Sequence, residues 1–292
     1  MTLPKTCRYC GRNFTPHEIR IIQKIISEDP TRTRSKISKL VCRTLQWFKP
    51  DGGLKDMSCR VAMLRMHEDG LISLPPARKT VPPNKRSRIE YTQDTAPGKL
   101  FTVPVGKLRN LNMSLVSSKN QSRIWNEYIH RYHYLGYKTL PGAQLRYFVY
   151  SDDSIIALLG FGAAAWKVAP RDQFIGWSPQ QREQKLHLIV NNARFLILPW
   201  VHSKNLASKT LSMASKQLLK DWLQIYNYQP VLLETFVQIN RFEGTCYKAA
   251  NWTCVGTTKG RGKLDRLNIA CLPRKNVWLY PLRKNFKELL CS

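Results

Sequence analysis

Residues 194–237 constrain the fold of this chain more than any other segment. The string RFLILPWVHSKNLASKTLSMASKQLLKDWLQIY reads as an apolar strand, a short loop and a long helix, and PVLLETFV reads as a second buried strand. Apolar side chains at helical spacing predict the buried stripe of the helix, formed by Leu211, Ala214, Leu218 and Trp222. Two buried strands joined by an amphipathic helix predict a mixed α/β domain.

The next segment, GTCYKAANWTCVGTTKGRG at residues 244–262, continues this pattern. Residues 247–252 predict a short helix that ends at Asn251 in a left-handed conformation, and residues 253–257 predict a strand. The resulting strand–helix–strand–helix–strand order resembles the core of the GNAT acyltransferase fold. The glycines that follow lack the GK[ST] spacing of a Walker loop, so we expect no loop of that type here.

The GNAT resemblance implies that the loop before the long helix holds the pyrophosphate of coenzyme A through backbone N–H groups. The family pattern there is Arg/Gln-x-x-Gly-x-Gly/Ala, which corresponds to residues 202–207. Only Ala207 fits the pattern, although Asn205 is a residue type that can imitate the glycine conformation. We therefore predict no cofactor, and coenzyme A and Mg²⁺ are kept as alternatives.

Other apolar runs of the C-terminal region predict further elements. Residues 145–150 and 155–161 are expected to form paired strands joined by a short turn. The aromatic-rich residues 126–137 predict a helix that ends at Gly136, and residues 186–198 supply more strand material. These elements would extend the sheet of the same domain.

The N-terminal region predicts three helices. Thr15 and Glu18 form a capping-box pattern that begins the first helix, Thr33 begins the second, and residues 55–68 form the third. The core side of the third helix is expected to carry Met57, Val61 and Leu64.

A short apolar strand is expected at residues 71–74, after a Gly70 cap and before a basic turn. This order suits a winged helix-turn-helix, in which the third helix enters the major groove and the wing lies along the DNA backbone. A helical packing domain whose charges face water is the alternative. The DNA contacts predicted for the winged helix are Lys55, Ser58, Arg60, Arg65, Arg78 and Lys79.

The sequence thus predicts an α+β protein with three parts. Residues 1–79 form a winged helix-turn-helix domain, residues 80–100 a basic linker, and residues 101–292 a GNAT-like mixed α/β domain.

The charge of the chain indicates its partner. Its net charge is +28, and residues 1–100 carry 20 Lys and Arg against 9 Asp and Glu, so the surplus extends over both halves. Such imbalance predicts contact with a polyanion, for which we expect DNA, although basicity that serves only solubility is the alternative. Further predicted contacts are Lys85, Arg86, Arg88, Lys204, Lys259, Arg261 and Lys263, with Trp166, Trp177, Trp200 and Trp252 as stacking candidates.

Cysteine usage and the absence of long apolar runs predict a cytoplasmic protein that does not contact membranes. Cys7 and Cys10 have the spacing of half a zinc site, but the sequence offers no obvious second pair, so we predict no zinc. His130 and His133 share a metal-ligand spacing without a carboxylate, which favours aromatic packing with a surface histidine.

Three residues are candidates for catalysis. Glu234 lies where a GNAT-like fold can keep a general base, and Tyr247 lies where it can keep a general acid. Asp172 with Glu234 could instead hold Mg²⁺ for DNA cleavage. The alternatives are an ion pair with a nearby Arg for either carboxylate and core packing for Tyr247.

Several long strings resemble one family. They are LVCRTLQWFKPDGGLKDMSCRVAMLRMHEDGLISLPPARK, YHYLGY, RDQFIGW, NNARFLILPWVHSKNLASKTLS, LLETFVQINRFEGTCYKAANWTCVGTTKGRGK and YPL. Together they resemble the DruA family of the Druantia anti-phage defence system, from about residue 12 to residue 282. Polar residues inside the matching strings are His133, Arg171, Asp172, Asn192, Arg194, Glu234, Tyr247, Asn251 and Arg261.

The resemblance implies a bacterial cytoplasmic protein that works with other defence-system subunits, including a large helicase-like protein. Similar domains also occur in transposase-like proteins. We therefore expect a DNA-binding component of a defence system. The alternatives are a nucleic-acid-acting enzyme, either a metal-dependent nuclease or an acyltransferase, and the DNA-recognition part of a transposition system.

Overall fold

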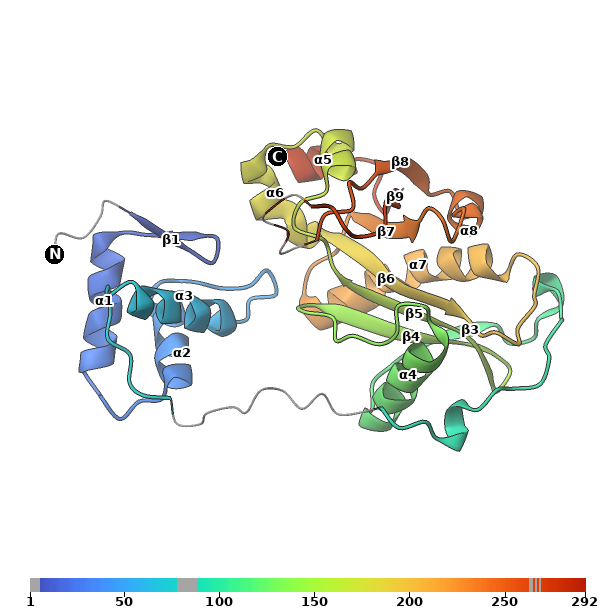
Figure 1. The fold of residues 1–292 in the computed structure, drawn as a ribbon, viewed down its shortest axis with the longest axis horizontal. Helices are drawn as coiled ribbons and strands as arrows, with labels where there is room; N and C mark the ends of the chain where they lie inside the picture. The colour runs from blue at the N-terminus through green and yellow to red at the C-terminus, as the bar shows by residue number, and fades with distance from the viewer. Residues whose placement is uncertain (1–5, 78–88, 263–264, 266, 268) are drawn as a thin grey trace. The chain divides into compact units, whose positions relative to one another are not determined.

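The computed structural model describes residues 6–77, 89–262, 265, 267 and 269–292 and divides the chain into two compact units. Unit 1 spans Met1–Ser87 and unit 2 spans Arg88–Ser292 (Figure 1). Each unit has a hydrophobic core of its own, and each is described here by itself.

Unit 1 consists of a β-hairpin and three helices, and Figure 1 colours it blue to teal. The capping box of Thr15 and Glu18 begins the first helix as predicted, and Thr33 caps the second. Gly70 follows the third helix with a positive φ, as a C′ glycine should. The elements are β1 (Cys7–Tyr9), β2 (Arg12–Phe14), α1 (Pro16–Ser27), α2 (Arg34–Thr44) and α3 (Asp56–Glu68).

The predicted core side of α3 was wrong. The buried face of the helix is formed by Cys59, Ala62, Met63 and Met66. The predicted set of Met57, Val61 and Leu64 is 60%, 41% and 40% exposed. Both sets recur at helical spacing, and tertiary packing selected the one that includes the small residues.

The strand predicted at residues 71–74 is also absent. The segment runs without a sheet partner, although Ile72 and Leu74 are buried. His67 and Gln23 hold its backbone through hydrogen bonds to the Ile72 and Leu71 carbonyls. A strand requires a neighbour to pair with, and in the described part of unit 1 pairing is limited to the N-terminal hairpin and an isolated bridge between Phe48 and Leu54.

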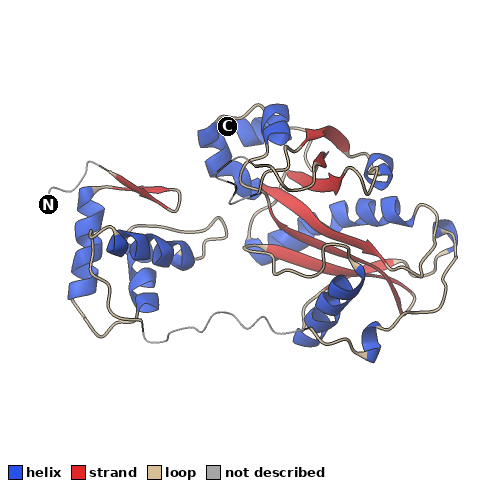
Figure 2. Cartoon of the chain, in the orientation of Figure 1, coloured by secondary structure: helices blue, strands red, loops and turns tan. Residues whose placement is uncertain are grey.

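Unit 2 is built on a seven-stranded mixed sheet, drawn in red in Figure 2. The strand order is β3-β4-β5-β6-β7-β9-β8, in which only the β6–β7 pair is parallel. The paired strands predicted near residues 145–161 are β4 and β5, and the predicted strands around residues 186–198 and 230–237 are β6 and β7. The bounds are β3 (Asn112–Leu115), β4 (Gln144–Ser151), β5 (Ser154–Ala163), β6 (Ile189–Ile197), β7 (Leu232–Gln238), β8 (Thr253–Thr257) and β9 (Lys275–Pro281).

Two long helices cover opposite faces of this sheet. Arg146 and Tyr147 are consecutive on β4, so their side chains point to opposite faces. Arg146 packs over Trp125 of α4 (Lys119–Tyr132), whereas the Tyr147 hydroxyl donates to Asp221 of α7 (Leu206–Tyr226) at 2.9 Å. The stripe predicted for α7 is buried, while α4 begins earlier and ends earlier than the predicted 126–137.

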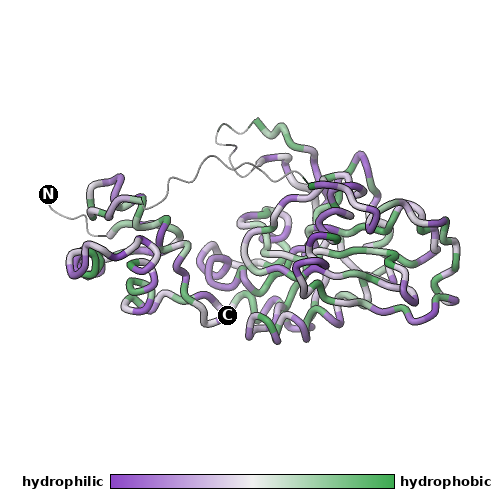
Figure 3. The backbone as a smooth tube through the Cα atoms, turned by 90° about the horizontal axis from the view of Figure 1, so that it is seen from below, coloured by the Kyte–Doolittle hydropathy of each residue, from purple (hydrophilic) through white to green (hydrophobic). Residues whose placement is uncertain are grey.

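Shorter helices cover the sheet near its β8 edge. Figure 3 shows hydrophobic stretches in the interior of unit 2 between hydrophilic loops. The short helix and strand predicted at residues 247–257 are α8 and β8, and Asn251 has a φ of 63° as predicted. The remaining helices are α5 (Ala169–Ile175), α6 (Pro179–Lys185), α8 (Thr245–Ala249) and α9 (Phe286–Cys291), with 3-10 turns at Gln93–Thr95, Val105–Lys107 and Leu186–Leu188.

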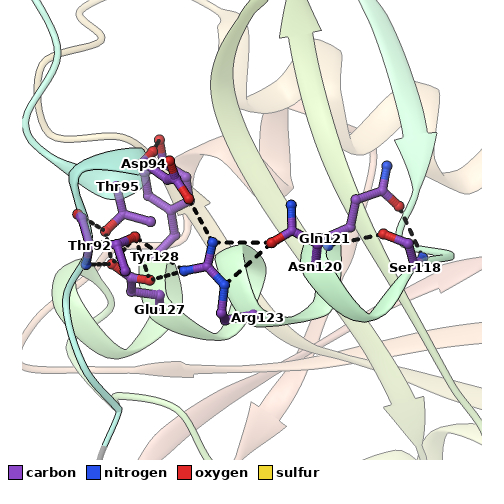
Figure 4. Close-up of polar contacts among 9 residues, drawn as sticks. All are labelled: Thr92, Asp94, Thr95, Ser118, Asn120, Gln121, Arg123, Glu127 and Tyr128. Carbon is purple, nitrogen blue, oxygen red and sulfur yellow. Dashed lines mark hydrogen bonds and ion pairs between the residues drawn. The ribbon is translucent and has the colours of Figure 1, made fainter.

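A buried carboxylate fastens the beginning of unit 2 to α4 (Figure 4). Glu127 is fully buried and accepts hydrogen bonds from Thr92, Thr95 and Arg123. Burial would raise the pKa of Glu127, but the hydrogen bonds from Thr95 and Thr92 and the charge of Arg123 lower it below its ordinary value. The carboxylate therefore stays ionised and fixes the chain before the sheet.

Candidate functional site

The parallel pair of β6 and β7 opens the sheet at its centre. The two strands pair from Ile189 and Leu232 as far as Asn191 and Glu234. Beyond these positions β6 continues along β5, whereas β7 continues along β9. The carboxyl ends of the two strands therefore separate, and ligands bind at such a point in open sheets with parallel strands.

A cavity of about 570 Å³ occupies this opening. Its wall is formed by β6 from Asn192, by β7 from Thr235, by the end of α4, and by residues 241–247 that lead into α8. This volume suits a small molecule or one unit of a polymer. The cavity contains three of the polar residues predicted from the family motifs, namely His133, Asn192 and Tyr247.

The floor of the cavity is a closed hydrogen-bond set. The Tyr247 hydroxyl donates to Asn192 Oδ1 at 3.0 Å, and Thr235 Oγ1 donates to the Asn192 carbonyl at 3.0 Å. Asn192 Nδ2 donates to the Arg194 carbonyl at 3.1 Å. Burial raises the pKa of Tyr247, so the hydroxyl keeps its proton. These groups hold one another in place, and the polar groups free to meet a ligand lie nearer the rim.

Positive charge gathers around the cavity without internal neutralisation. Arg241 lines the cavity, whereas Arg194 on β6 and Lys275 at the start of β9 lie outside its lining, and Arg194 donates to the Gly136 and Ala193 carbonyls at 3.2 and 2.7 Å. Among the described residues, none of the three forms an ion pair with Asp or Glu. Burial lowers the pKa of Arg194, and burial together with Arg194 lowers that of Lys275. Glu243, which is exposed, is the carboxylate of the lining.

The pKa of His133 reflects the same positive charge. Burial, with the charges of Arg194 and Arg241, lowers its pKa to about 4, so the ring is neutral at pH 7. Its Nδ1 accepts the Leu135 N–H at 3.2 Å, which places the proton of the neutral ring on Nε2. His133 therefore adds a hydrogen-bond donor to the cavity wall without adding a charge.

Aromatic rings form the mouth of the cavity. Tyr134 and Phe242 meet edge to face with centroids 5.3 Å apart, and His133 stacks on Tyr134 at 4.9 Å. The Arg241 guanidinium lies 4.6 Å from the Tyr134 centroid and 5.6 Å from the Phe242 centroid. Phe242 is nonetheless 46% exposed, which leaves one ring face available for stacking.

The beginning of α7 contributes Ala207 to the same cavity. Asn205 has a φ of 65°, as predicted for a residue that imitates glycine, and α7 has no side-chain cap there. His202 is hydrogen-bonded to the Pro199 carbonyl at 3.1 Å. The loop thus has the left-handed residue predicted at Asn205, whereas the Arg or Gln of the GNAT pattern is missing.

The predicted catalytic carboxylates lie in an internal ion network beside the cavity. Arg171 Nη1 donates to Glu234 Oε2 at 2.8 Å, and Arg171 Nη2 donates to Asp172 Oδ1 at 2.7 Å. The other Glu234 oxygen accepts the Ala165 N–H at 2.8 Å, and Trp177 Nε1 also donates to Asp172. Burial raises the pKa of Glu234, while the Arg171 charge and the Ala165 N–H oppose that rise.

This network does not fit Mg²⁺. The Arg171 guanidinium stands between the two carboxylates and occupies the position that a shared cation would need. No group of three or more His, Cys, Asp and Glu side chains suited to a metal occurs in the described part of the chain. The geometry therefore favours the ion-pair alternative for Asp172 and Glu234 over a metal-dependent nuclease.

The predicted nucleic-acid contacts lie in several places. Lys55 is the N-cap of α3, and Ser58 and Arg65 lie within that helix. Arg60, also on α3, is paired with Asp56 at 3.2 Å. Lys204 and Lys259 are exposed, and Arg261 lies 4.0 Å from Asp265. Of the stacking candidates only Trp166 is largely exposed. Six predicted contacts lie outside the described residues: Arg78, Lys79, Lys85, Arg86, Arg88 and Lys263.

Sequence reasoning missed the residues that complete the cavity and a basic face on unit 1. Tyr134, Arg241 and Phe242 meet where the end of α4 approaches the loop after β7, and Lys275 is placed by β9, which lies beside β7 in the sheet. On α2, exposed cations at intervals of three and four positions surround a depression of about 340 Å³, which their helical spacing could have indicated: Lys36, Lys39 and Arg43.

A sequence profile described as Druantia protein DruA matches residues 68–272, which is more than half of the chain. The chain belongs to the DruA family. The family assignment predicted from the sequence strings is thereby confirmed. The match includes the whole cavity wall of the DruA chain and most of its sheet. No curated protein matches the sequence.

Solved structures that resemble this DruA chain include acyl-transferring enzymes. An acetyltransferase from Bacillus subtilis in complex with CoA has 9% identity and a TM-score of 0.36, covering 60% of this chain and 100% of that chain. A spermidine N-acetyltransferase SpeG chimera from Vibrio cholerae and hSSAT has 10% identity and a TM-score of 0.38, covering 58% and 95%. FeeM, an N-acyl amino acid synthase from uncultured soil microbes, has 12% identity and a TM-score of 0.37, covering 60% and 93%.

The strand order itself confirms a mixed α+β fold with a large mixed sheet. None of the helices in the described ranges is long and apolar enough to cross a membrane.

Proposed function

We propose that this DruA-family chain is a nucleic-acid-binding component of the Druantia defence system. The observation that carries the proposal is the group of cations around the cavity, which has no internal counter-ions. Arg194 and Lys275 are partly buried and Arg241 is exposed, and a phosphate backbone would supply anions for this group. Both units contribute to the electrostatic attraction, because unit 1 has 18 Lys and Arg against 7 Asp and Glu, and unit 2 has 29 against 12.

Unit 1 would bind the backbone of duplex DNA in this proposal. A winged helix that reads the major groove through α3 stays part of the proposal, but α3 presents Met57, Val61 and Leu64 beside Arg65. Apolar side chains contact few groups on DNA beyond thymine methyls. The exposed cations of α2 are better suited to phosphate contacts.

The test is binding of the full chain to labelled duplex and single-stranded DNA in a salt series. We expect the affinity to fall by roughly tenfold or more between about 50 and 200 mM salt, as several phosphate contacts require. A triple Gln variant at Lys36, Lys39 and Arg43 should weaken duplex binding and reduce its salt dependence. Affinity that stays constant across the series would refute the proposal.

A second candidate function is group transfer within the cavity, with DNA or protein as acceptor. It is favoured by the left-handed Asn205 at the start of α7 and by the protonated Tyr247 hydroxyl, which would have to leave Asn192 Oδ1 to act as a general acid. The donor would be an acyl-coenzyme A thioester, whose C–S bond breaks as the acyl group passes to the acceptor and coenzyme A leaves as the thiol. Analysis of DNA and protein after incubation with acetyl-coenzyme A would reveal an acylated product if this function is correct.

The family also supplies partners for the proposal. Other defence-system subunits, including a helicase-like protein, would act on the nucleic acid that this chain holds in the cytoplasm. Co-purification of the full chain with those subunits, with and without DNA, tests whether nucleic acid is needed for the assembly.

A further inference from the structure

The cavity between β6 and β7 has the properties of a site for one nucleotide. Its volume of about 570 Å³ can hold a base with its sugar, but the opening between two strands of one sheet cannot hold a duplex. Its wall combines cations with aromatic rings, and that pairing is the one that single-stranded nucleic acids require.

We propose that this cavity binds a nucleoside phosphate, and the inference rests on the nucleic-acid binding proposed above. The phosphate contacts the guanidinium of Arg241, which lines the cavity beside Tyr134 and Phe242. The base stacks on Phe242 at the mouth, where the ring is 46% exposed. His133 Nε2 supplies a neutral donor beside them.

The internal hydrogen bonds of the cavity explain why the rim, and not the floor, meets the ligand. Asn192 Oδ1 accepts from Tyr247, and its Nδ2 donates to a carbonyl, so both ends of the amide are occupied. A base would therefore gain stacking and charge contacts without an amide to read its edge. We infer that the site accepts different bases with similar affinity.

The nucleotide could come from a DNA strand or from the free pool, since both carry the same phosphate and base. In a strand, the unit would be an unpaired nucleotide at an end, in a gap, or extruded from a duplex. The basic surface of both units favours the strand, because it would bind the phosphates on either side.

The experiment measures binding of the full chain to a short single-stranded DNA, a blunt duplex, a deoxynucleoside monophosphate, inorganic phosphate and coenzyme A. The test variants are Arg241→Gln and Phe242→Ala, since both side chains are exposed and neither supports the core. Arg109→Gln is the matched control, because Arg109 is exposed and lies outside the cavity. Circular dichroism of each variant verifies that it is folded.

We expect Arg241→Gln and Phe242→Ala each to weaken single-stranded DNA and mononucleotide binding by about tenfold, with Arg109→Gln changing either by less than about twofold. Blunt-duplex binding should change little in all three. Mononucleotide binding that the cavity variants weaken, without DNA binding by the wild type, would support the cavity but refute the proposed function.

A different result would refute the nucleotide site and not the proposed function. DNA binding that is steeply salt-dependent, with no difference between the cavity variants and Arg109→Gln, would overturn the nucleotide site and leave the proposed function standing. Coenzyme A that binds more tightly than every nucleotide and loses affinity in the variants would also overturn it, and would favour group transfer.

Discussion

Two neighbouring regions of unit 2 treat charge in opposite ways. Glu234 and Thr235 are consecutive on β7, so their side chains face different regions. On the Glu234 side, Arg171 is neutralised by two carboxylates at 2.7 and 2.8 Å. On the cavity side, Arg194 and Lys275 are partly buried without a carboxylate partner among the described residues. The first region is neutralised within the chain, and the anion proposed for the second would come from outside the chain.

In a basic protein, a rare carboxylate can be either a catalytic group or a counter-ion of a buried cation. The sequence has 19 Asp and Glu against 47 Lys and Arg, which made Asp172 and Glu234 stand out as catalytic candidates. The structure shows carboxylates such as Glu127 and Glu234 acting as internal counter-ions in the protein interior. A group of cations without carboxylate partners is therefore better evidence for a ligand site than the presence of a carboxylate.

The largest effect is expected from breaking the completed network. Arg171→Met leaves Glu234 and Asp172 buried without their shared cation, and should lower the free energy of unfolding by about 3–5 kcal/mol. Urea unfolding of the full chain, followed by tryptophan fluorescence, measures the loss.

The matched control is Arg123→Met, which removes a cation from the other buried carboxylate. Glu127 keeps its donors Thr92 and Thr95, and Arg123 is 44% exposed, so this loss should be clearly smaller. Equal losses in the two variants would contradict the view that the Arg171 network is the more tightly coupled one.

A carboxylate placed in the cavity should neutralise the nearby cations, as Asp172 and Glu234 neutralise Arg171. Thr245 lines the cavity, is exposed and lies in the first turn of α8, where a Glu is compatible with the helix. Thr245→Glu should weaken single-stranded DNA binding by about tenfold, or about 1.4 kcal/mol, while leaving stability nearly unchanged.

Ser212→Glu adds the same charge at an exposed position of α7 outside the cavity lining, and it serves as the control. Its effect on binding should be that of one screened surface charge. If both variants weaken binding equally, net charge alone sets the affinity and the cavity has no special part in it.

The sequence predicted local features of this molecule better than the site. The Thr15 capping box and the left-handed Asn205 and Asn251 depend on a few adjacent residues, so the residue types alone indicated them. The α3 core face could not be chosen locally, because two apolar sets share the helical spacing and packing with α1 and α2 decides between them.

The cavity could not be predicted for a different reason. Arg241 lines it, Arg194 lies on β6 and Lys275 lies at the start of β9, and the place of Lys275 beside Gln238 depends on β9 inserting between β7 and β8. The sequence order would place β8 before β9, next to β7. Arg194 was among the polar motif residues, but nothing local to it indicated that Lys275 would be its neighbour.

The smallest effect is expected in the titration of His133, which reports the field of the cavity directly. Its pKa is about 4 in the folded chain, because burial and the charges of Arg194 and Arg241 disfavour the protonated ring. The other ionisable residues of the cavity lining are Arg131, Tyr132, Tyr134, Arg241, Glu243, Cys246 and Tyr247. A carboxylate or a bound phosphate would oppose the two Arg charges, so Thr245→Glu should raise the pKa of His133 by roughly 1.

The effect on stability follows from the same shift. The unfolded chain takes up a proton at the ordinary value of 6.5, whereas folded His133 stays neutral until the pH approaches about 4. Folding is therefore destabilised as the pH falls through this window, and His133→Gln should make the unfolding free energy less dependent on pH there. NMR titration of the histidine Cε1–H signals measures the pKa. A His133 pKa that stays unchanged on adding a nucleotide would mean that no phosphate enters the field of Arg194 and Arg241.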